Sequence, residues 1–89
     1  MMRVVELFAG VGGFRIGFEG PPENPDRSRF GVIWSNQWEP STKAQHAAEV
    51  YVQQWGLEQS DYDLEVYSNG SDDKFVNKDI GTIEASDIP

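Results

Sequence analysis

Short apolar segments alternate with polar and glycine-rich stretches along this chain, in the spacing of an α/β protein. The run from Val4 to Phe8 is rich in β-branched and large apolar residues, and it predicts a buried strand. Glycines at positions 10, 12 and 13 follow, and then an amphipathic segment from Phe14 to Phe18 predicts a helix. Many nucleotide pockets of α/β proteins are built from a strand, a glycine turn and a helix. The segment therefore predicts either such a pocket or a tight turn without a ligand.

The spacing of the glycines separates the ligand classes. Dinucleotide-binding turns have the form G-x-G-x-x-G, and counted from Gly10 the third glycine would fall at Arg15. Phosphate-binding loops need a Lys followed by Ser or Thr, and no such pair follows these glycines. A ligand without a phosphate group, such as S-adenosylmethionine, therefore fits the turn better than a nicotinamide dinucleotide. A fragment of a nicotinamide-dependent oxidoreductase is the less favoured alternative.

Two further apolar patterns predict a second strand and a second helix. Residues 30–34 predict a short buried strand that ends at Ser35 and Asn36. A helix is expected over residues 41–54, and Gly56 is its expected C-terminal stop. The apolar face expected for this helix comprises Ala44, Ala47, Ala48, Val50 or Tyr51, and Trp55.

The pattern weakens in the last third of the chain. Residues 57–77 are acidic and polar and predict an insert, either a small hairpin or a mobile loop, and the charge run from Asp61 to Asp73 is expected to be solvated surface. Residues 78–81 predict the end of a third strand, followed by a helical turn over 82–85. The whole pattern predicts a partial Rossmann-like α/β three-layer sandwich, with about three parallel strands in the order 3-2-1 and flanking helices.

Length and composition narrow the function classes. The 89 residues form one small domain or part of a larger one, and 15 acidic against 7 basic residues disfavour extensive contact with a nucleic-acid backbone. The absence of cysteine excludes disulfides, thiolate metal sites and cysteine nucleophiles within this chain. His46 is expected to be a partly exposed helix residue with no metal or acid–base role. With no apolar run long enough to cross a membrane and no signal-peptide layout, the expected location is the cytoplasm.

Three motifs together resemble the DNA cytosine-5 methyltransferases. The first motif of that family has the form Asp/Glu-Leu-Phe-x-Gly-x-Gly-Gly, and residues 6–13 read Glu-Leu-Phe-Ala-Gly-Val-Gly-Gly. Its second motif is Asn-Glu-Trp-Asp, where residues 36–39 read Asn-Gln-Trp-Glu, and its third is an Asp-Ile pair, matched by residues 79–80. The resemblance covers residues 1–89 apart from the acidic insert. It implies the N-terminal part of a catalytic domain that binds S-adenosylmethionine, yields S-adenosylhomocysteine and methylates C5 of cytosine in double-stranded DNA. The expected setting is a bacterial or archaeal restriction–modification system.

The resemblance also implies which residues contact the cofactor. Phe8 and Trp38 would pack on opposite sides of the adenine. Asp79 would accept a hydrogen bond from the adenine amino group, beside an apolar or backbone contact from Ile80. The backbone that faces the methionine part would come from Gly10, Val11, Gly12 and Gly13.

Two features of the chain depart from the family pattern. Gln37 stands where the family has a glutamate that accepts hydrogen bonds from both ribose hydroxyls, and because an amide offers only one acceptor oxygen, we expect a weaker ribose contact. The family's nucleophilic cysteine, in a Pro-Cys pair after the third motif, has no counterpart here. We therefore expect a cofactor-binding fragment that has no catalytic residue and is inactive alone. The alternative is a non-catalytic module for an adenosine ligand or a partner, such as one chain of a split methyltransferase.

The predicted strand order also bears on self-association. In the order 3-2-1 the first strand lies at an open edge of the sheet. Unpaired apolar edge strands favour pairing with further chain or with a second protomer. We therefore expect the chain to self-associate through residues 4–8.

Overall fold

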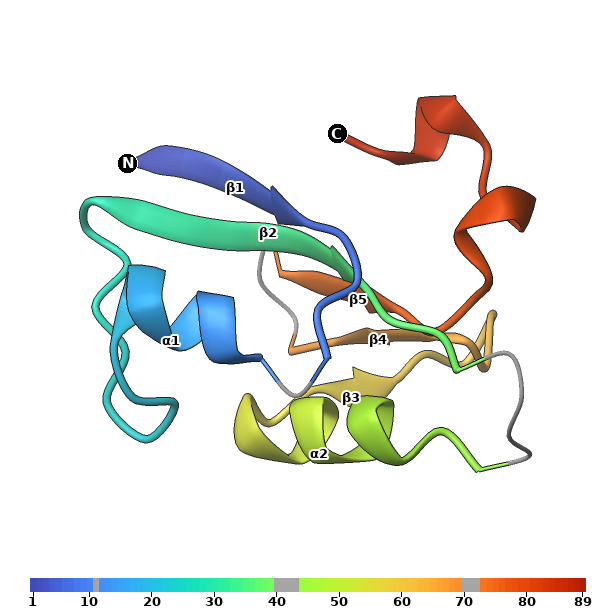
Figure 1. Ribbon diagram of the computed structural model, residues 1–89, viewed down its shortest axis with the longest axis horizontal. Helices are drawn as coiled ribbons and strands as arrows, with labels where there is room; N and C mark the ends of the chain where they lie inside the picture. The colour runs from blue at the N-terminus through green and yellow to red at the C-terminus, as the bar shows by residue number, and fades with distance from the viewer. Residues whose placement is uncertain (11, 40–43, 70–72) are drawn as a thin grey trace.

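The computed structural model describes residues 1–10, 12–39, 44–69 and 73–89. Its centre is a five-stranded mixed sheet (Figure 1). Strand β1 (Met2–Glu6) pairs in parallel with β2 (Phe30–Asn36), and β2 pairs in parallel with β5 (Lys74–Val76). Strand β4 (Val66–Ser68) is antiparallel to β5 and to β3 (Glu58–Gln59), which gives the order β1-β2-β5-β4-β3. The α/β class is therefore confirmed.

The predicted order 3-2-1 differs from the order observed. β1, β2 and β5 form a parallel row, but residues 57–77 also contribute the short antiparallel strands β4 and β3 beside β5. This segment is therefore part of the sheet and does not form a separate insert. Of the two predictions for this segment, the small hairpin is confirmed by the pairing of β3 with β4. The third parallel strand lies at residues 74–76, earlier than the predicted 78–81, because Phe75 and Val76 supply the buried apolar side chains.

Two short α-helices pack on one face of the sheet (Figure 1). Helix α1 (Gly13–Glu19) follows the glycine turn, and α2 (His46–Gln54) precedes the hairpin. Helix α2 begins at His46, so the predicted helix over residues 41–54 is wrong at Ala44 and Gln45, which are not helical. The predicted residues 41–43 lie outside the described residues. Gly56 has a φ of +63°, in the left-handed region that suits the end of a helix, as predicted.

The apolar face of α2 is narrower than predicted. Ala48, Tyr51 and Trp55 are buried, whereas Val50 is 40% exposed. Ala44 is also exposed, and Ala47 is half-buried. Of the two alternatives for the centre of this face, the structure selects Tyr51.

The hydrophobic core is divided between the two faces of the sheet. On the helix side, Tyr51 from α2 and Trp55 directly after α2 pack with Phe75 from β5 and with residues beside the glycine turn. On the other face, Trp34 and Val76 pack against the C-terminal segment, which contains the 3-10 helices η1 (Ile80–Thr82) and η2 (Ala85–Asp87) (Figure 1). The C-terminal segment thus covers the face of the sheet that the α-helices leave open.

The two described α-helices contain seven and nine residues, well short of the roughly 20 needed to cross a bilayer.

Candidate functional site

The carboxyl ends of the three parallel strands meet at one edge of the sheet. The backbone N–H of Ala9, just past β1, donates to the carbonyl oxygen of Asn36 at 2.8 Å. The N–H of Gln37, just past β2, donates to the carbonyl oxygen of Val76 in β5 at 3.3 Å. Each of the three sequence motifs follows one of these strands, so the fold brings the motifs to the edge where open α/β sheets bind ligands.

A direct hydrogen bond joins the first motif to the second. The backbone N–H of Gly10 donates to Oε1 of Gln37 at 2.8 Å. Because a backbone N–H can only donate, the side-chain atom that faces it must be the amide oxygen. The Gln37 NH2 group therefore points away from Gly10, and its hydrogens are available in another direction. Two of the predicted cofactor residues are thus in contact.

The turn after β1 presents an aromatic ring and open backbone. Phe8 has a φ of +55°, which is uncommon outside glycine, and its side chain is 70% exposed. Together with Ala9, Gly13 and Phe14 it lines a surface hollow of about 370 Å³. A Cβ added at Gly10 or Gly13 would have no atom within 4 Å, so this side of the turn is accessible. Val11 lies outside the described residues.

Gly12 is closely packed. Its φ is +96°, and a Cβ at this position would lie 2.2 Å from Cζ3 of the buried Trp55. Its carbonyl oxygen accepts the N–H of Ile16 at 3.1 Å, at the start of α1. The glycine at this position therefore fixes the approach of the turn to α2.

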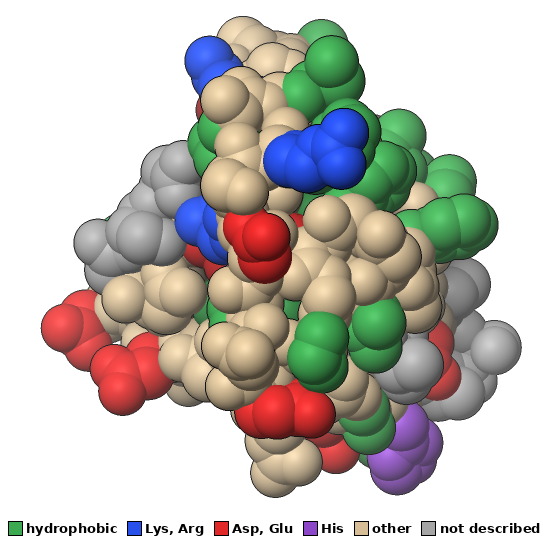
Figure 2. Space-filling model, turned by 90° about the vertical axis from the view of Figure 1, so that its left-hand side faces the viewer, with side chains coloured by type: hydrophobic (Ala, Val, Ile, Leu, Met, Phe, Trp, Pro, Cys, Tyr) green, Lys and Arg blue, Asp and Glu red, His purple; other side chains and the backbone are tan. Residues whose placement is uncertain are grey.

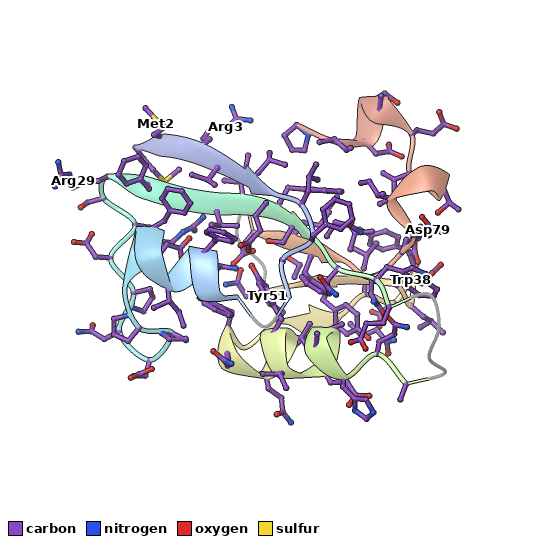
Figure 3. All side chains as sticks on the ribbon, in the orientation of Figure 1. Met2, Arg3, Arg29, Trp38, Tyr51 and Asp79 are labelled. Carbon is purple, nitrogen blue, oxygen red and sulfur yellow. The ribbon has the colours of Figure 1, made fainter. Side chains whose placement is uncertain are left out.

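The residues of the second and third motifs lie together at the far end of the sheet. Figure 3 shows Trp38 and Asp79 on the side where β2 and β5 end. The side-chain amide of Asn36 donates to the carbonyl oxygens of Val76 (3.1 Å) and Lys78 (2.7 Å), which ties the two segments together. Trp38 is half-buried and Asp79 is exposed.

Asp79 and Ile80 also have structural contacts. Oδ1 of Asp79 accepts the N–H of Gly81 at 2.9 Å, so the carboxylate caps the 3-10 helix η1. Ile80 packs against the core cluster that contains Trp34 and Val76. An apolar contact from the Ile80 side chain to a ligand would therefore compete with this packing, and the Ile80 carbonyl oxygen already accepts the N–H of Ile83 at 3.2 Å.

Beneath the glycine turn lies a buried polar cluster that sequence reasoning missed. Arg15 is 2% exposed, and its guanidinium donates to Glu19 (Nε–Oε1, 3.0 Å) and to both carboxylate oxygens of Asp73. Its Cζ lies 4.9 Å from the ring centre of Trp55, in a cation–π contact. Asp73 is only 1% exposed, so the predicted solvated charge run from Asp61 to Asp73 is wrong at its last residue.

The hydroxyl of Tyr51 connects this cluster to the end of β1. It accepts from Nη1 of Arg15 (3.1 Å), donates to Oε1 of Glu6 (2.8 Å) and lies 2.7 Å from Oγ of Ser35. Burial raises the pKa of the Glu6 carboxyl above its ordinary value, against the opposing effect of the hydrogen bonds from Tyr51 and Ser35. Burial likewise raises the pKa of Tyr51, which keeps its hydroxyl protonated and able to donate.

The sequence offered a partial signal for this cluster. Arg15 lies in the segment predicted to be helical and Glu19 comes directly after it, four residues from Arg15, which is the spacing of an ion pair on a helix. Asp73, however, lies 58 positions from Arg15 in an acidic stretch, and the local sequence gives no sign of its burial. His46, by contrast, is a helix residue with a side chain 77% exposed, as predicted.

Comparison with known proteins agrees with the motifs at this edge. A model of the family described as C-5 cytosine-specific DNA methylase matches residues 2–87. The Type II methyltransferase M.Sau3AI of Staphylococcus aureus is 56% identical over 50 residues, which are 56% of this chain but only 11% of that protein. No solved structure matches the chain significantly. Because the family match covers nearly all of its residues, the chain belongs to the C-5 cytosine-specific DNA methylase family.

Proposed function

We propose that this chain is the S-adenosylmethionine-binding portion of a DNA cytosine-5 methyltransferase that methylates C5 of cytosine in DNA. The observation that carries the proposal is the hydrogen bond between Gly10 and Gln37. It joins the first two motifs at the carboxyl ends of β1 and β2, beside the segment that carries the third motif. That edge is where open α/β sheets bind nucleotide-like ligands.

The chemistry of the described residues suits this cofactor. The exposed ring of Phe8 offers a stacking surface for adenine, and the open backbone at Gly10 and Gly13 admits the methionine part. The exposed Asp79 offers a carboxylate to an amino group. The residues proposed to hold the cofactor are Phe8, Gly10, Val11, Gly12, Gly13, Gln37, Trp38, Asp79 and Ile80. When bound, S-adenosylmethionine supplies an activated methyl group, and S-adenosylhomocysteine is the product.

Catalysis would need residues that these 89 positions do not contain. The family's nucleophile is a cysteine, and the chain has none. We therefore propose that the chain alone has no methyltransferase activity and that its contribution is to hold the cofactor. With a formal charge of −8 it would also contribute little to DNA binding.

We propose a setting for the intact enzyme from its relative. The matched protein is a Type II methyltransferase of a bacterium. DNA methylation in a bacterial restriction–modification system, in the cytoplasm, is therefore the proposed context.

Calorimetric titration separates this proposal from a dinucleotide-binding function. S-adenosylhomocysteine should bind, with an affinity below that of an intact enzyme, whereas NAD should not. Adenosine is the informative control ligand, because it lacks the homocysteine part that the open glycine backbone is proposed to contact. Tight binding of NAD, or equal affinity for adenosine and S-adenosylhomocysteine, would contradict the proposal.

Self-association through β1 is proposed separately. β1 lies at an edge of the sheet. Met2, its first residue, is 64% exposed, and Met1 before it is 59% exposed. Figure 2, which views the end of the molecule where the N-terminus lies, shows hydrophobic side chains at the surface of this face. Light scattering at increasing concentration should show oligomers, and Met2→Lys should reduce them because a charged edge resists strand pairing. A clean monomer at high concentration would contradict this proposal.

A further inference from the structure

One phenolic oxygen contacts both flanks of the glycine turn. Tyr51 donates to Glu6, the last residue of β1, at 2.8 Å, and accepts from Arg15, in the first turn of α1, at 3.1 Å. Ser35, near the end of β2, lies 2.7 Å from the same oxygen. The hydroxyl is therefore a junction between the strand that enters the turn and the helix that leaves it.

Packing holds the Tyr51 ring in place independently of its hydroxyl. The ring stacks on Phe75 with centres 4.6 Å apart and lies against Trp55 at 4.7 Å. The residue is completely buried, between the two α-helices and the sheet (Figure 3). A ring fixed in this way presents its hydroxyl with little loss of side-chain entropy, so the three contacts hold the turn efficiently.

We propose that Tyr51 is a positioning residue, whose hydroxyl clamps the turn between β1 and α1 in the conformation that receives the cofactor. The effect on cofactor affinity rests on the proposed function, but the clamp itself is a property of the fold. Tyr51 would act through Glu6 and Arg15 without touching the ligand.

Three backbone amides of the turn report on the clamp. The N–H groups of Ala9, Gly10 and Gly12 donate to Asn36, Gln37 and Ala9, at 2.8, 2.8 and 3.0 Å. Hydrogen exchange at these amides requires the turn to open. The N–H groups of Gln37 and Asn77, bonded to Val76 and Glu65, report on the sheet instead.

The test is amide hydrogen exchange, followed by NMR, in the full 89-residue chain carrying Tyr51→Phe. This change removes the hydroxyl and keeps the ring, so the stacking on Phe75 and Trp55 is retained. Exchange at Ala9, Gly10 and Gly12 should become roughly tenfold faster, as expected for the loss of hydrogen bonds to charged groups, with Gln37 and Asn77 unchanged. An equal acceleration at all five amides would show a purely global role and overturn the proposal, as would no change in the turn.

Tyr67→Phe is the matched control. Tyr67 is half-buried and packs edge-on against Phe75, and among the described residues its hydroxyl has one long hydrogen bond, of 3.5 Å, from Gln59. Tyr67→Phe also removes a tyrosine hydroxyl from a ring that packs against Phe75, and it should leave hydrogen exchange in the turn unchanged. If Tyr67→Phe accelerates the turn as much as Tyr51→Phe, the clamp is not specific to Tyr51 and the proposal fails.

Ligand binding provides the second readout. The affinity for S-adenosylhomocysteine should fall about tenfold in Tyr51→Phe and stay unchanged in Tyr67→Phe. An unchanged affinity in Tyr51→Phe would overturn the positioning role. If the unmutated chain binds no S-adenosylhomocysteine, the proposed function fails, whereas the exchange experiment still decides whether Tyr51 clamps the turn.

Discussion

Arg15 in α1 and Asp73, next to β5, form a buried ion pair across 58 positions of the sequence. Both carboxylate oxygens of Asp73 accept from the guanidinium, with Nη1 to Oδ1 at 3.3 Å. Arg15 also lies in the helix that opens at the glycine turn. The ion pair therefore connects the glycine turn to β5. The Asp73 carboxylate also gives the buried Arg15 a charge partner, which a buried arginine requires.

Asp73→Asn should lower the free energy of unfolding by about 3 kcal/mol. The substitution keeps the shape of the side chain but removes one of the two carboxylates that pair with the buried Arg15. Glu19 remains, but it also pairs with Arg27 at 3.3 Å, so the positive charge is only partly compensated. Urea denaturation measures the change. Asp61→Asn, an exposed position in the same acidic stretch, is the control and should change stability by less than about 0.5 kcal/mol. Equal effects of the two substitutions would contradict the assigned role of Asp73.

Two glycines of the first helix region should respond to alanine with opposite signs. Gly12→Ala should destabilise the fold by about 2 kcal/mol, because it places a Cβ 2.2 Å from Trp55 at a φ of +96°. Gly17→Ala should stabilise it by about 0.5–1 kcal/mol, since the position is helical and the new Cβ meets nothing within 4 Å. Thermal or urea unfolding of both variants tests the pair. A neutral Gly12→Ala would show that the turn does not pack on Trp55.

Glu6 should give the stability a measurable pH dependence. Burial raises its folded-state pKa above the ordinary value of 4.5, outweighing the opposing effects of Tyr51, Ser35 and Arg15, while Glu19 adds to the rise. The folded state then binds the proton more tightly than the unfolded state, so Glu6 lowers the free energy of unfolding as the pH rises from about 4.5 through the folded-state pKa.

Glu6→Gln should remove this contribution. The difference in unfolding free energy between the variant and the unmutated chain should shift in favour of the variant as the pH rises from 4.5. Other carboxyl groups titrate in both proteins, so the difference isolates Glu6. Denaturation series at pH 4, 6 and 8 provide the comparison, and a difference that stays constant with pH would contradict the assignment.

Gln37→Glu should strengthen binding of S-adenosylhomocysteine by roughly three- to tenfold. One carboxylate oxygen can replace Oε1 as the acceptor for the Gly10 N–H, and the other can accept from a ligand hydroxyl in a charge-assisted hydrogen bond. Gln54→Glu, at the exposed end of α2, introduces the same charge away from the site and should leave the affinity unchanged. Weaker binding by Gln37→Glu would mean that the amide NH2 of Gln37 is the group that the ligand requires.

The sequence predicted the second strand well, the first strand in part, and the remaining strands poorly. The predicted buried strand over residues 4–8 is wrong at its last two residues, because β1 ends at Glu6 and the side chains of Leu7 and Phe8 are 47% and 70% exposed. Residues 4–8 and 30–34 contain apolar runs that differ clearly from their flanks, and these runs lie in or next to β1 and β2. β5 has only Phe75 and Val76 as buried apolar residues, in an acidic stretch. Its pairing with β2 and β4 depends on contacts between distant segments, which local periodicity does not encode.

The candidate site could likewise be predicted from the sequence only in part. That the motifs share one edge could be predicted, because the carboxyl ends of parallel strands meet there. The contact between Gly10 and Gln37 depends on how far β1 and β2 are offset, and the structure supplies that register. The junction at Tyr51 could not be predicted, since its partners Glu6, Arg15 and Ser35 come from three other elements.

Amide NMR during titration with S-adenosylhomocysteine is the decisive test of the proposed cofactor site, because it detects weak binding and reports where it occurs. We expect saturable shifts confined to the edge where the motifs meet, at Phe8, Gly10, Gln37, Trp38 and Asp79. The amides of Trp34 and Lys74, which line a cavity with the C-terminal segment, serve as internal controls and should not shift. Absence of shifts at millimolar ligand, or shifts centred on that cavity, would contradict a cofactor site at the ends of β1, β2 and β5.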